Sequence, residues 1–225
     1  MRGEARGDIT FDIGMRDDLP LAKKREIARS MRNAEYVDYY APPEIMDKMG
    51  HLHTGKDGYV VSGINSHDKF SDLLAGCTGI IAVGTNKETR KNISFAAHQS
   101  PEALGLGVGS LVVDYSPTRN KFKQDLSQRL SELRTMAEPK TVRIAVFGGM
   151  VHESELANYK QNMDAVAALV HELVGLHPSL IKSPNRAHAE LEGYANEFTD
   201  VLFTNKQRHL YILKHVMRYR RPMEP

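Results

Sequence analysis

The chain has 225 residues, of which 41% are hydrophobic and 26% charged, as is usual for a globular protein. Thirty basic and 28 acidic side chains leave a formal net charge of +2, so charge gives no reason to expect a nucleic-acid or anionic-membrane partner. No apolar run approaches the roughly 20 residues that span a bilayer, and the first residues lack the apolar segment of a secretory signal. The single cysteine excludes an intrachain disulfide. We therefore expect a cytoplasmic protein, with a translocated effector as the other option.

Charged residues crowd positions 1–50, where the one regular apolar pattern predicts a helix over 20–33. Pro42 and Pro43 close this stretch, because paired prolines cannot continue a helix. We interpret 1–50 as a partly helical N-terminal extension that packs loosely on a main domain at 51–225.

The patterns become regular from Gly58 onward. They predict strands over 59–61, 79–83, 93–97, 111–115 and 142–147, helices over 116–138 and from a Ser154 cap to Gly175, and a terminal hairpin of 201–203 with 210–213. This order predicts an α+β fold with a layered, sandwich-like β-sheet core and two main helices packed against it.

Cys77 lies between two glycines in the run Leu74-Ala75-Gly76-Cys77-Thr78-Gly79, at the start of an apolar strand. Glycine permits a tight turn and a close backbone approach, so the amides around Cys77 and Thr78 are candidate oxyanion donors. The alternative for a lone cysteine is an inert place in the core.

His98 ends the next apolar strand. If the two strands pair through the polar loop at 84–92, the hairpin brings the Cys77 thiol and the His98 imidazole to one edge, within hydrogen-bond reach. There the imidazole takes the thiol proton, and the imidazolium stabilises the nucleophilic thiolate.

This stretch resembles the Cys/His deamidase superfamily that contains CheD, the cytotoxic necrotizing factor catalytic domain, lethal-factor toxins and the YfiH-type proteins. Leu74-Ala75-Gly76-Cys77 is similar to the toxins' Leu-Ser-Gly-Cys motif, and His98 follows at a suitable interval. Ser71 stands six positions before the cysteine, where the family has threonine. The resemblance covers roughly residues 58–214, including a strand that ends in Phe147-Gly148-Gly149 and a helix that contains Asn162.

The resemblance implies hydrolysis of a carboxamide, most often a glutamine side chain of a protein substrate, without a cofactor or a metal. Cys77 would be the nucleophile, His98 the general base and later the acid, and Ser71 a third member that orients the imidazole. The sequence does not indicate the oligomeric state.

Two other functions stay open. A zinc or purine-nucleoside enzyme of the YfiH type would need His51, His53 or His67 to join Cys77 and His98, although Gly76 stands where that family has aspartate. A non-catalytic protein of the same fold would bind a partner through residues 1–50.

Overall fold

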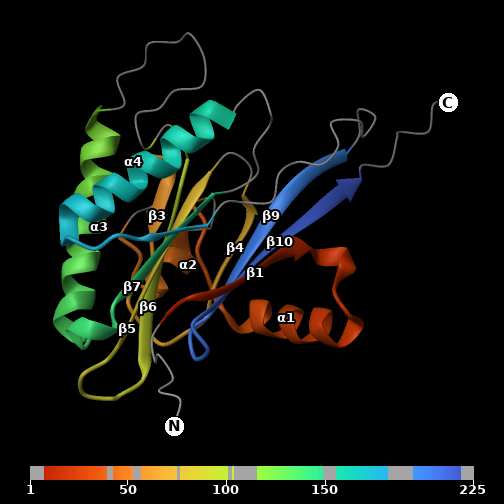
Figure 1. Cartoon of the computed structure of the whole chain (residues 1–225), viewed down its shortest axis with the longest axis horizontal. Coiled ribbons are helices and arrows are strands. Elements are labelled where there is room, and N and C mark those ends of the chain that lie inside the picture. Colours follow the sequence, from red (N-terminus) through yellow and green to blue (C-terminus); the bar gives the residue numbers. More distant parts are fainter. Residues whose placement is uncertain are drawn as a thin grey trace.

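The computed structural model describes residues 8–39, 43–52, 57–74, 77–100, 103, 116–148, 156–181 and 195–218. Two five-stranded sheets form its centre (Figure 1). The first has the strand order β1-β10-β9-β4-β2, built from β1 (Thr10–Met15), β2 (Glu35–Tyr36), β4 (Lys69–Leu74), β9 (Ala195–Thr204) and β10 (His209–Arg218). The second has the order β3-β6-β5-β7-β8, built from β3 (Tyr59–Val61), β5 (Thr78–Thr85), β6 (Asn92–Gln99), β7 (Arg143–Gly148) and β8 (Ser179–Ile181).

Helices cover the outer faces of both sheets. The helices α3 (Ser116–Met136) and α4 (Leu156–Val174) lie on the second sheet, and α1 (Leu21–Asn33) lies beside the first (Figure 1). Leu126 and Leu130 of α3 and Val166 of α4 are buried against the second sheet, as their helical spacing predicts. The predicted α+β fold, with layered sheets and helices packed against them, is confirmed.

The core between the two sheets explains the apolar run in β5. Ile81 and Val83 of β5 face the first sheet, where they join Phe203 and Ile212. Ile80 and Ala82 point to the opposite side, toward the helices. A central strand covered on both faces shows no polar alternation, so the middle of β5 is an unbroken apolar run over residues 80–83.

Residues 8–39 are built into the first sheet. The strand β1 pairs in parallel with β10, and β2 pairs in parallel with β4. Ile27 of α1 is buried against Leu202 and Tyr211 of the same sheet. The expected loose packing is therefore wrong for residues 8–39, because two edge strands and a helix face hold them in place. The division of the chain at residue 50 stays a prediction.

Most predicted elements are confirmed, including α1, β3, the β5–β6 hairpin, α3, β7, α4 and the β9–β10 hairpin. The short helix α2 (Pro43–Lys48) begins at Pro43, where we expected the prolines to end regular structure. Proline suits the first turn of a helix, since that amide has no partner there. The predicted strand at 111–115 and the Ser154 cap lie outside the described residues. Within the described ranges, no helix is long and apolar enough to cross a membrane.

Candidate functional site

The β5–β6 hairpin brings Cys77 and His98 to the same face of the second sheet. The strands are antiparallel, with Gly79 opposite His98 and Thr78 opposite Gln99. Cys77 comes one residue before β5, so it is a diagonal neighbour of His98, a separation of about 7–8 Å between Cα atoms that side chains can bridge. The thiol is partly buried against the core between the sheets.

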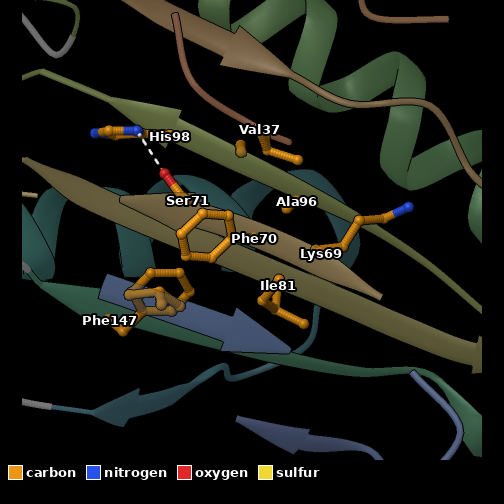
Figure 2. A pocket seen from close by; sticks show the side chains of 10 residues that line it. Val37, Lys69, Phe70, Ser71, Ile81, Ala96, His98 and Phe147 are labelled. Atoms are coloured by element: carbon orange, nitrogen blue, oxygen red, sulfur yellow. Dashed lines mark hydrogen bonds between the residues drawn. The ribbon is translucent and has the colours of Figure 1, made fainter. Parts of the chain in front are cut away.

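Ser71 approaches His98 from the opposite sheet. Its hydroxyl oxygen lies 2.9 Å from His98 Nδ1, and both residues are buried (Figure 2). Ser71 sits on β4, and its side chain points into the space between the sheets. The residue six positions before Cys77 therefore contacts the imidazole directly, in the position that an orienting group would need.

Burial controls the charge of His98. Loss of solvent lowers the pKa of its imidazole from 6.5 to about 3, although a hydrogen bond with the Val37 backbone acts in the opposite direction. The ring is therefore neutral near neutral pH. Nε2 has no hydrogen-bond partner in the described part of the chain. When Nδ1 carries the proton, Nε2 offers a lone pair that can accept another proton.

Two residues that the sequence analysis missed complete the surroundings of His98. Asp38 Oδ2 lies 3.7 Å from His98 Nδ1, and the Tyr39 ring packs edge-on against the imidazole with 4.9 Å between ring centroids. The Tyr39 hydroxyl lies 3.3 Å from Cys77 Sγ. Within the described ranges Nε2 has no hydrogen-bond partner, so it does not bond to the thiol, as the sequence analysis expected of the imidazole; Tyr39 contacts both groups.

A buried ion pair holds β2, the strand that precedes Asp38 and Tyr39, against β4. Lys69 Nζ donates to Glu35 Oε2, and Asn65 Nδ2 donates to the same carboxylate oxygen at 2.8 Å. Burial lowers the pKa of Lys69, while Glu35 favours its charged form. The Val37 amide then donates to the Phe70 carbonyl at 2.7 Å, which extends the β2–β4 pairing toward Asp38.

Gly79 has a different role from the one expected. A Cβ atom at this position would lie 2.1 Å from Phe147 Cε2, so the glycine makes room for the Phe147 ring of β7. Gly79 lies within a strand rather than a tight turn, because ladder pairs with His98 and Phe147 hold it on both sides. The other flanking glycine, Gly76, lies outside the described residues.

A small cavity lies beside the imidazole, between the two sheets. Ser71, His98, Phe147 and Lys69 are among its lining residues (Figure 2). Its volume is about 10 Å³, room for one water molecule, so it does not accommodate a glutamine side chain.

His51 and His67, the described histidines of the zinc alternative, belong to no metal-holding cluster in the part of the chain that the structure describes. His51 Nε2 lies 3.7 Å from Glu35 Oε1, His67 is exposed, and His53 lies outside the described residues. Among the residues that the structure describes, no group of three or more His, Cys, Asp or Glu side chains is arranged to hold a metal ion. No family model matches the chain, and a search of curated proteins finds no match.

Proposed function

We propose that the protein is a cysteine hydrolase that deamidates a carboxamide, with glutamine side chains of a protein as the substrate. Cys77 is the nucleophile, His98 the general base and Ser71 the residue that orients the base. The hydrogen bond of 2.9 Å between Ser71 Oγ and His98 Nδ1 carries the proposal. It supports a tautomer in which Nδ1 donates to the serine and Nε2 remains free to accept a proton.

The reaction takes place in two halves. His98 Nε2 accepts the Cys77 proton, and the sulfur attacks the amide carbon to form a tetrahedral oxyanion. Collapse of this intermediate breaks the C–N bond, and the imidazolium returns its proton to the departing ammonia. Water, deprotonated by the same imidazole, then hydrolyses the thioester, which yields the carboxylate and restores the thiol.

Asp38 adds an electrostatic contribution to this sequence. Burial opposes the imidazolium that forms when His98 accepts a proton. A carboxylate 3.7 Å from Nδ1 favours that cation, so Asp38 offsets part of the cost at the step where charge develops. Ser71 fixes the orientation of the His98 ring, and Asp38 stabilises the positive charge that the ring gains.

Glutamine-to-glutamate conversion in a mixture of native proteins tests the proposal. Each sample is incubated with the enzyme, digested, and analysed by mass spectrometry for new glutamates at glutamine positions. We expect specific sites to be converted by the wild type and by Ser94→Ala, but not by Cys77→Ser or His98→Asn. Ser94 is a suitable control because it is buried on β6, the strand that also carries His98. Its hydroxyl has no hydrogen-bond partner in the described ranges. Equal conversion by wild type and Cys77→Ser would exclude the cysteine as nucleophile.

A further inference from the structure

Tyr39 connects the two groups that the proposed reaction requires. Its hydroxyl reaches the sulfur of Cys77 at 3.3 Å, and its ring packs on the imidazole of His98. Tyr39 is 9% exposed, so its contact with the partly buried thiol is largely shielded from water.

The segment that leads to Tyr39 is attached to the first sheet. The Glu35–Lys69 ion pair and the hydrogen bond from the Val37 amide to the Phe70 carbonyl attach residues 35–37 to β4. The same strand carries Ser71, two residues beyond Lys69. Strand β4 and its neighbouring segment therefore supply Ser71 to the imidazole and Tyr39 to the thiol.

We propose that Tyr39 is a further functional residue of this site, whose hydroxyl donates a hydrogen bond to the Cys77 thiolate and stabilises it as the nucleophile. This inference rests on the proposed function, since it takes Cys77 as the nucleophile. A phenol ordinarily ionises near pH 10, about 1.5 units above a free thiol, so the tyrosine keeps its proton when the thiol loses its own. In the thiol form either group can donate, whereas in the thiolate form only the tyrosine can.

A hydrogen bond made to the charged form lowers the pKa of the group that receives it. Removal of the Tyr39 hydroxyl should therefore raise the pKa of Cys77 by about one unit and reduce the thiolate fraction about tenfold at neutral pH. The chain has one cysteine, so every thiol signal reports on Cys77.

The test compares Tyr39→Phe with Tyr36→Phe. Each substitution removes one hydroxyl from the same segment and keeps the ring. The Tyr36 hydroxyl donates to Asp72 Oδ1 at 2.6 Å, which makes Tyr36→Phe a matched control for a lost, partly buried hydrogen bond. The rate of alkylation by iodoacetamide is measured across pH, and the ultraviolet absorbance of the thiolate provides a second titration, with Cys77→Ser as its blank.

We expect Tyr39→Phe to shift both titrations upward by about one pH unit and to slow alkylation about tenfold at neutral pH, while Tyr36→Phe follows the wild type. Identical profiles for wild type and Tyr39→Phe would overturn the inference. Faster alkylation of Tyr39→Phe would also overturn it, because the hydroxyl would then shield the sulfur instead of activating it. An equal shift in Tyr36→Phe would assign the effect to loosening of the segment.

The same measurements separate this inference from the proposed function. A shifted titration in Tyr39→Phe, together with absent glutamine conversion by the wild type, would retain the role of Tyr39 and reject the deamidase. Glutamine conversion that depends on Cys77, with an unshifted titration in Tyr39→Phe, would retain the deamidase and reject the role of Tyr39.

Discussion

Acid should destabilise the fold through His98. The contribution of this residue to the pH dependence of the unfolding free energy should be absent in His98→Asn. In the unfolded chain this histidine binds a proton below about pH 6.5, whereas burial lowers its pKa in the folded protein to about 3. Between these two values the unfolded state holds more protons at this position. The free energy of unfolding therefore falls as the pH falls, by about 1.4 kcal/mol per pH unit from this one group. The contribution is fully present above pH 6.5 and is lost progressively down to about pH 3.

From about pH 6 to about pH 4, the loss from His98 amounts to roughly 2.5 kcal/mol. Carboxylates titrate in the same range, so the test is the difference between wild type and His98→Asn. Asparagine keeps a polar group near the position of Nδ1, where Ser71 can still bond, but does not titrate. Urea unfolding at several pH values gives the free energies. The wild type should lose about 2.5 kcal/mol more than the variant over this range, and parallel pH dependence of the two proteins would refute the assignment of a buried, neutral His98.

Two substitutions test the packing and the hydrogen bonding of the site. Ser71→Ala should destabilise the protein by about 1–3 kcal/mol, because it leaves the buried imidazole nitrogen without its hydroxyl partner, and should reduce glutamine conversion at least tenfold. Ser71→Thr should restore most of both, whereas Ser94→Ala should change neither, and equal effects of the two alanine variants would contradict the orienting role. Gly79→Ala should lower the unfolding free energy by about 1–3 kcal/mol, since its methyl group would overlap the Phe147 ring. At Gly14 an added methyl meets no described atom within 4 Å, so equal destabilisation by Gly14→Ala would refute this explanation.

The predicted parts of the fold are those in which apolar spacing is undisturbed. The faces of α3 and α4 and the apolar run of β5 were predictable because each buries a regular set of side chains. Strand β4 was missed because its residues toward the space between the sheets are Lys69 and Ser71, which break the usual alternation. Their burial depends on partners distant in the sequence, Glu35 and His98, so no local pattern marks the strand.

Part of the candidate site could likewise be predicted from the sequence, and part could not. The pairing of the strands next to Cys77 and at His98 follows from a hairpin, which local sequence specifies. Asp38 and Tyr39 reach the same site only through the parallel pairing of β2 with β4, a long-range contact between two short polar segments. One feature of the sequence indicates that this segment is packed. The run Tyr-Val-Asp-Tyr-Tyr at 36–40 concentrates aromatic residues in a charged region, which is unusual for a solvent-exposed extension.

We expect His98 to activate Cys77, and the rate of iodoacetamide alkylation at neutral pH tests this most directly. The thiol of wild-type protein should react faster than a free model thiol, whose pKa is about 8.5, and His98→Asn should react more slowly than the wild type. Because the chain has one cysteine, the intact mass of the protein reports the reaction of Cys77 without digestion. A wild-type rate no greater than that of the model thiol, unchanged by His98→Asn, would contradict the proposed nucleophile.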